Sequence, residues 1–166
     1  ELPFGKRKRW GNSANAVLSR VIGEWQVQGI YTGQTGQALG FGNSIFTGDI
    51  KAVPLPKDQR TVARWFNTNA GFERSSARAL SFNYRTLNSR FSGVRGDGIN
   101  QFNLSVIKNT KIGESKTIQF RAEGINAFNH AMFLNPNTNP ASGGFGTITD
   151  EKSSGRAIQL GLKFLW

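Results

Sequence analysis

The stretch that decides the fold is Arg156-Ala-Ile-Gln-Leu-Gly-Leu-Lys-Phe-Leu-Trp166. Apolar residues occupy every second position from Ile158 to Trp166. A period of two predicts a β-strand, and about 9–11 residues suffice for a tilted strand to cross a bilayer. A soluble edge strand that ended on a bare Phe-Leu-Trp would be prone to aggregate. A strand with one face in lipid and an aromatic at the membrane interface avoids this hazard.

Four positions of this stretch carry a resemblance. The pattern Gln159-Xaa-Gly161-Xaa-Xaa-Phe164-Xaa-Trp166 resembles the C-terminal signal by which bacterial outer-membrane β-barrels are passed to their assembly machinery. The resemblance implies that Gln159, Gly161, Phe164 and Trp166 form a barrel-assembly signal. From this stretch alone, the closing strand of a soluble β-sandwich remains the alternative.

The composition agrees with a barrel better than with a packed soluble domain. Hydrophobic residues make up 37% of the 166 residues, which is low for a soluble core. No apolar run approaches the roughly 18 residues of a transmembrane helix, which excludes helical spans but not barrel strands. There is no cysteine, so disulfides, thiolate metal sites and thiol nucleophiles are excluded. The net charge of +11 raises the possibility of nucleic-acid binding, but the charge is dispersed apart from residues 6–9.

A second strand is predicted at residues 24–34. Trp25 and Tyr31 lie on one side of it, about 20 Å apart along the strand, which is close to the spacing of the two aromatic girdles of a barrel. Gln26 and Gln28 lie on the other side and suit a water-filled lumen.

Two further strands, 101–109 and 116–126, form a hairpin around the short turn 111–115, and residues 1–5 are interpreted as the tail of another strand. Alternation assigns each strand residue to one of two faces. The predicted lumen-facing residues are Gln26, Gln28, Asn103, Ser105, Gln119, Arg121, Glu123 and Lys163. The predicted lipid-facing residues are Trp25, Val27, Phe102, Leu104, Val106, Ile118, Phe120, Leu160 and Leu162.

The connections between the strands are unequal. One helix is expected at 13–22, capped by Asn12 or Ser13 and ended by Gly23. Residues 40–98 and 130–155 lack a regular pattern, apart from strand-like pieces at 79–84 and 144–149. Since outer-membrane barrels have short periplasmic turns and long outer loops, we expect extracellular loops at 40–98 and 130–155 and periplasmic turns at 6–23 and 111–115.

The expected fold is therefore all-β. Residues 1–166 form an antiparallel meander of about five strands at the C-terminal end of a large transmembrane barrel, with one short periplasmic helix.

Several stretches, taken in order, resemble the Oar-like TonB-dependent outer-membrane receptors, whose chains include a carboxypeptidase-regulatory-like domain. The match covers nearly the whole chain, and its most specific part is Gln119-Phe-Arg-Ala-Glu123 with Asn126-Ala-Phe-Asn-His130. The other matching stretches are Leu2–Lys6, Gly23–Ile30, Trp65–Asn67, Arg95–Asn100 with Asn103–Ser105 and Lys108–Asn109, and Arg156–Lys163. Asn103 and Gly124-Ile125 depart from the family pattern, which leaves lumenal chemistry less defined than the fold.

The resemblance implies a barrel of about 22 strands that takes up an unknown substrate with energy supplied through TonB. It also implies that the plug domain, the TonB-contacting segment and the regulatory-like domain lie upstream of Glu1. The expected partners are the lipid bilayer and lipopolysaccharide, the barrel-assembly machinery, TonB through the missing N-terminal part, and the substrate, but not nucleic acid.

No residue pattern predicts catalysis, a cofactor or a metal, so the protein is not expected to be an enzyme. His130 is the only histidine and has no cysteine or second histidine to act with it. The basic run at 6–9 is either a solvated turn or a polyanion-binding patch. Two alternatives to a transporter fragment remain open: a complete small outer-membrane barrel, and a soluble basic β-protein that binds polyanions.

Overall fold

The computed structural model describes residues 1–78, 86–152 and 155–166. The chain divides into two compact units: Glu1–Thr32, Asn100–His130 and Ser154–Trp166 form the first, and Gly33–Ile99 and Ala131–Ser153 form the second. The strand-like piece predicted at 79–84 lies outside the described residues. In the described ranges, no helix has the length and apolar character needed to cross a membrane.

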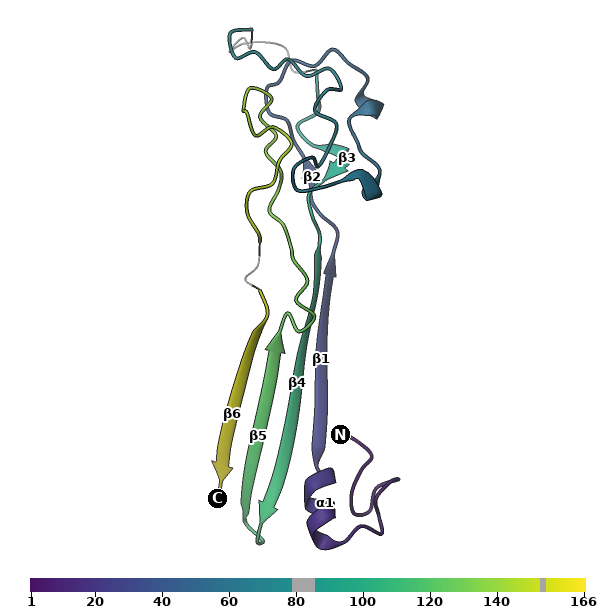
Figure 1. Cartoon of the computed structure of the whole chain (residues 1–166), viewed down its shortest axis with the longest axis vertical. Coiled ribbons are helices and arrows are strands. Elements are labelled where there is room, and N and C mark those ends of the chain that lie inside the picture. Colours follow the sequence, from purple (N-terminus) through teal and green to yellow (C-terminus); the bar gives the residue numbers. More distant parts are fainter. Residues whose placement is uncertain (79–85, 153–154) are drawn as a thin grey trace. The chain divides into compact units, whose positions relative to one another are not determined.

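The first unit is built on an open antiparallel sheet in the order β1-β4-β5-β6 (Figure 1). Its strands are β1 (Trp25–Gln34), β4 (Ile99–Ile112), β5 (Lys116–Ile125) and β6 (Ala157–Leu165). β4 extends further at both ends than the predicted 101–109. The predicted antiparallel meander is confirmed. The further strand tail expected at residues 1–5 is irregular, and it meets the sheet where the Leu2 amide donates to the Trp25 carbonyl at 2.7 Å.

The register of β5 fixes the two faces of the sheet. Gln119, Arg121 and Glu123 stand opposite Lys163, Gly161 and Gln159 of β6. On the other face, Ile118, Phe120 and Ala122 stand opposite Phe164, Leu162 and Leu160. Directly opposed residues of antiparallel strands point to the same side, so one face is polar and the other is apolar.

The helix α1 (Ala16–Ile22) is shorter than predicted. Asn15, and not Asn12 or Ser13, is the N-cap, and its side chain accepts a hydrogen bond from the Leu18 amide at 2.8 Å. The side-chain oxygen of Asn12 is engaged elsewhere, since it accepts from the Arg7 amide at 2.9 Å. Gly23 does end the helix, but with an extended backbone (φ −84°). It has no room for a Cβ, which would lie 2.7 Å from the Ser19 carbonyl oxygen.

The second unit has little regular structure: the short strands β2 (Ala38–Leu39) and β3 (Phe91–Arg95), and the 3-10 turns η1 (Ile50–Ala52) and η2 (Lys57–Gln59). β2 and β3 pair as an antiparallel two-stranded sheet. The strand predicted at 144–149 is wrong, because Gly144 to Gly146 form turns in which the Phe145 amide donates to the Ser142 carbonyl and Gly146 has a φ of 83°.

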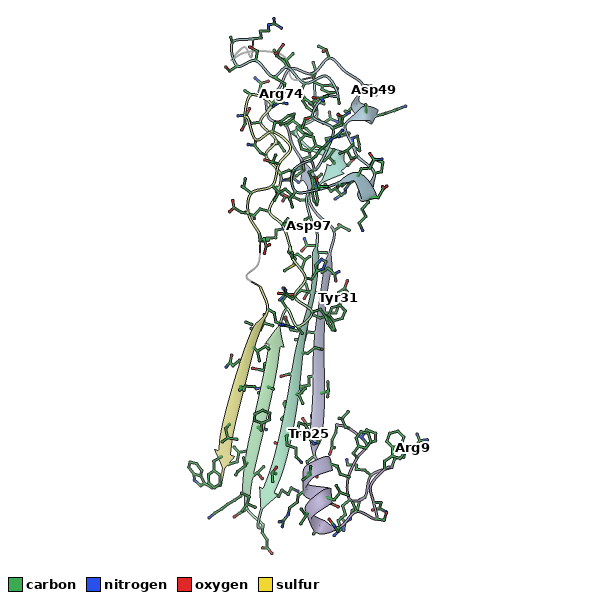
Figure 2. The ribbon with its side chains drawn as sticks, viewed as in Figure 1. Arg9, Trp25, Tyr31, Asp49, Arg74 and Asp97 are labelled. Carbon is green, nitrogen blue, oxygen red and sulfur yellow. The ribbon has the colours of Figure 1, made fainter. Side chains whose placement is uncertain are left out.

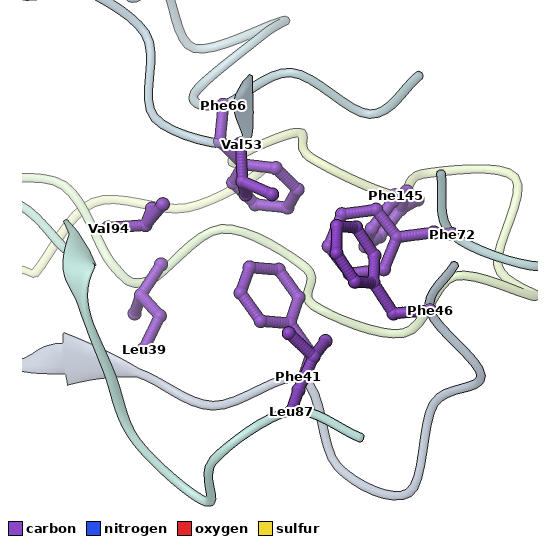
Figure 3. Close-up of a cluster of buried hydrophobic side chains, with 9 residues drawn as sticks. All are labelled: Leu39, Phe41, Phe46, Val53, Phe66, Phe72, Leu87, Val94 and Phe145. Carbon is purple, nitrogen blue, oxygen red and sulfur yellow. The ribbon is translucent and has the colours of Figure 1, made fainter. Parts of the chain in front are cut away.

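This unit nevertheless has a core of its own (Figure 3). The core residues are Leu39, Phe41, Phe46, Val53, Phe66, Phe72, Leu87, Val94 and Phe145. Phe66 and Val53 are fully buried, and the Phe66 ring centroid lies 5.1 Å from those of Phe41 and Phe145. Residues that the sequence indicated only as irregular loops are thus packed around aromatic side chains brought together from distant positions.

Candidate functional site

The polar face of the sheet brings together the residues predicted to face the lumen. Gln119, Arg121, Glu123 and Lys163 share it by register, and Ser105 joins them because it stands opposite Glu123. The Trp25 and Tyr31 rings contact Lys108 and Phe102 on the apolar face of β4. Gln26 and Gln28 alternate with them along β1, so they fall on the polar face. That this face lines a lumen stays a prediction.

Hydrogen bonds link the polar side chains across β4 and β5. Glu123 accepts from the Ser105 hydroxyl at 3.0 Å and from the Arg121 Nε at 3.1 Å. Gln119 donates to the Asn109 side chain at 2.9 Å. Arg121 and Glu123 therefore pair with each other along β5, and Glu123 also bonds to the neighbouring strand. In this network the polar side-chain atoms have hydrogen-bond partners. A face packed in a hydrophobic core would carry apolar side chains instead.

The opposite face is apolar and exposed. Leu160 and Leu162 are 66% and 75% exposed, and Val27 is 50% exposed. A contiguous exposed apolar surface marks a membrane or protein contact, because burying it in a monomer would be favourable. The structure thus places the nine residues predicted to face lipid on one side of the sheet, and lipid contact remains a prediction for them.

Aromatic rings gather at both ends of this apolar face. Figure 2 shows Trp25 and Tyr31 toward opposite ends of the sheet. The Tyr31 ring stacks on Phe102 at 4.5 Å, and Phe102 contacts Phe128 at 5.2 Å. Two aromatic belts separated by an aliphatic band are typical of transmembrane barrels. The sequence indicated Trp25 and Tyr31; the ring of Phe128 joins only through the fold.

The four residues of the proposed assembly signal lie on β6 or just beyond its end. Gln159 and Gly161 are on the polar face, and a Cβ at Gly161 would have the Arg121 Cβ as its nearest neighbour, at 3.9 Å. Phe164 is on the apolar face, and its ring lies 5.9 Å from that of Trp166. Trp166 is 88% exposed. No contact in the structure tests a role in assembly.

Lys108 is a residue whose place the sequence reasoning missed. It stands opposite Phe120, on the apolar face of β4. Its ammonium lies 5.6 Å from the centre of the Trp25 ring and donates to the Gly23 carbonyl at the end of α1. Alternation continued from Val106 to Lys108 already predicts that Lys108 lies on the apolar face. Its hydrogen bond to the Gly23 carbonyl could be found only in the structure.

Several residues that carry the family resemblance form side-chain hydrogen bonds to the backbone of other segments. In the second unit, the Trp65 indole donates to the Arg95 carbonyl at 2.7 Å, and the Asp97 carboxylate accepts from the Phe133 amide at 2.9 Å. In the first unit, the Asn126 side chain bonds both backbone groups of His130, at 2.9 and 3.0 Å. These motif residues shape the connections between strands.

The basic run forms a closed turn. Arg7 has a φ of 64°, and the Lys8 amide donates to the Gly5 carbonyl at 3.1 Å. The Lys8 ammonium lies 3.0 Å from the Glu1 carboxylate, and this charged hydrogen bond lowers the pKa of Glu1 below its ordinary value. Two of the four cations are thus engaged locally, since Arg9 also lies over the Trp10 ring.

No metal site can be built from the described ranges, in which no cluster of three or more His, Cys, Asp or Glu side chains occurs. The expectation that the protein has no catalytic, cofactor or metal site stays a prediction.

A comparison with known families decides the class. Residues 1–159 match the family described as the outer membrane beta barrel domain. The chain belongs to this family. No curated protein and no solved structure was found to match it.

Family membership places this barrel protein in the bacterial outer membrane and sets aside the soluble polyanion-binding protein. The open four-stranded sheet is then a section of barrel wall. The family match ends at residue 159, before Gly161, Phe164 and Trp166. It therefore supports the barrel without bearing on the assembly signal.

Proposed function

We propose that the chain is wall and outer-loop structure of an Oar-like TonB-dependent receptor that takes up an unidentified substrate, and that it is not an enzyme. The observation that carries the proposal is the inequality of the connections between strands. The connection between β4 and β5 is a short turn, Gly113–Ser115. The long connections, residues 33–99 and 131–153, build a unit with its own aromatic core. Large ordered outer loops suit a receptor that must recognise a ligand before admitting it.

The open sheet supports a larger barrel. In lipid, unpaired backbone groups at a sheet edge each cost several kcal/mol, so spanning sheets close. β1 and β6 each have an edge without a strand partner in the described residues. Further strands from upstream would close the barrel, and the same upstream part would carry the plug and the TonB contact. A small complete barrel is the less favoured alternative, because four long strands account for the described sheet.

The proposed partners follow from this role. The apolar face contacts the bilayer, the second unit contacts lipopolysaccharide, and the proposed assembly signal on β6 engages the assembly machinery. We propose no nucleic-acid partner, because two of the four cations of the basic turn, Lys8 and Arg9, are engaged by Glu1 and Trp10.

The experiment compares small-molecule depletion from the medium by cells with and without the full-length protein, each in strains with and without a working TonB. We expect one class of compound to be depleted only when both are present. Depletion that is independent of TonB would contradict energised uptake, and leakage of many unrelated solutes would indicate a passive pore.

A further inference from the structure

Helix α1 ends beside the apolar face of the sheet. Two side chains of the apolar face hold its C-terminal end: the Trp25 indole donates to the Val21 carbonyl at 2.8 Å, and the Lys108 ammonium donates to the Gly23 carbonyl. If the apolar face meets lipid, the C-terminal end of α1 is therefore held at the lipid-facing side of the sheet. Figure 2 shows Trp25 at the α1 end of the sheet.

The helix has an exposed apolar flank. Val17, Leu18 and Val21 are 72%, 48% and 61% exposed, and no residue of α1 is buried. At about 100° per residue, Arg20 lies between this flank and the opposite side of the helix. A short helix with bare aliphatic residues flanked by cations is typical of segments that lie in a membrane interface.

A basic cavity of about 370 Å³ lies beside that flank, between α1, the basic turn and the end of β4. The charged residues that line it are Lys6, Lys8, Arg20, Glu24, Lys108 and Lys111. Lys8 is paired with Glu1. Lys108 donates to the Gly23 carbonyl. Among the described residues, the other three cations, Lys6, Arg20 and Lys111, make no ion pair, and they outnumber the one lining carboxylate, Glu24.

We propose that this cavity binds the phosphate of an anionic glycerophospholipid in the periplasmic leaflet, while Val17, Leu18 and Val21 enter the same leaflet. The proposal rests on the assignment of the apolar sheet face to lipid. Lys6, Arg20 and Lys111 supply the charge, and Arg20 offers a planar fork that suits phosphate oxygens. Soluble phosphate would use the cations alone. A lipid also uses the adjoining apolar flank, which is why we favour the membrane source.

The test measures lipid adducts by native mass spectrometry on the intact full-length protein released from outer membranes in detergent. The probes are phosphatidylglycerol, phosphatidylcholine and inorganic phosphate. Two triple variants remove equal charge, one at the cavity and one at exposed lysines of the second unit: Lys6→Gln/Arg20→Gln/Lys111→Gln and Lys51→Gln/Lys57→Gln/Lys152→Gln.

Each cation near an anionic lipid surface contributes about fivefold to affinity at low salt, so three contribute up to about 100-fold. We expect phosphatidylglycerol to bind the unchanged protein more tightly than phosphatidylcholine does. The cavity triple should lose at least about tenfold in affinity, and the control triple should change by less than about twofold.

An equal loss of phosphatidylglycerol affinity in the two triple variants would overturn the proposal. So would equal affinities of the unchanged protein for phosphatidylglycerol and phosphatidylcholine. Displacement of phosphatidylglycerol by inorganic phosphate at equal concentration would overturn the membrane source and leave a soluble anion site. If the cavity triple variant no longer shows the heat-modifiable gel migration of a folded barrel, the single variant Arg20→Gln replaces it. Unchanged affinity in that variant would count against the site. None of these results depends on TonB or uptake, so failure here is distinguishable from failure of the proposed transport role.

Discussion

Truncation of Phe66 to alanine tests whether the aromatic core holds the second unit together. Phe66 is 0% exposed, and its ring contacts those of Phe41, Phe72 and Phe145. Removing a buried phenyl ring costs about 3–5 kcal/mol, because transfer energy is lost and a cavity remains. If the unit opens locally, its open population should rise between about 100-fold and about 4,000-fold.

The assay is limited proteolysis of the purified full-length protein in detergent, with the cleavage rate followed by the appearance of fragments. Heat-modifiable migration reports separately whether the barrel remains folded. The matched control is Leu134→Ala, also in the second unit, because Leu134 is 42% exposed and its truncation should change stability by less than about 0.5 kcal/mol. Equal cleavage rates for Phe66→Ala and Leu134→Ala would refute the core as the element that orders these loops.

Three further predictions concern the sheet. Phe164→Ser, or removal of Trp166, should lower the amount of protein in the outer membrane and expose it to periplasmic proteases, while molecules that insert keep their ligand binding per molecule, because the outer loops are unchanged. A cysteine at Gln28 should react with a membrane-impermeant thiol reagent and one at Val27 should not, since alternation puts them on opposite faces. Asn126→Ala should lower the thermal midpoint of the barrel, because the side chain is 2% exposed and each of its two bonds to His130 is worth about 0.5–1.5 kcal/mol.

Each of these has a clear contrary result. Normal surface levels after both changes at the C-terminus would rule out an assembly role, measured by surface quantification beside a binding assay. If the cysteine at Val27 reacted with the reagent and the one at Gln28 did not, the assignment of the two faces would have to be reversed. For Asn126, a midpoint equal to that of an exposed control such as Asn139→Ala would show that the buried amide does not hold the strand connection.

The faces of the sheet could be predicted because their signal is local. Successive strand side chains point to opposite sides, so Gln119, Arg121 and Glu123 separate from Ile118 and Phe120 whatever the partner strand is. The register then aligned these faces across strands, as alternation requires when one face is apolar. The helix was also recognisable, but its cap was not, because the choice between Asn12 and Asn15 depends on the turn that engages the Asn12 side chain.

The sequence by itself determined the four long strands of the sheet and their two faces, and it favoured a barrel over a soluble sandwich, since a period of two and a terminal aromatic strand need no knowledge of distant contacts. Only the tertiary structure decided that the irregular loops share a core, because Phe41 and Phe145 meet across more than half the chain and no local pattern joins them. It also decided that Lys108 holds the end of α1 beside Trp25. Packing between remote segments depends on the closure of the whole chain, whereas alternation is a property of each strand alone.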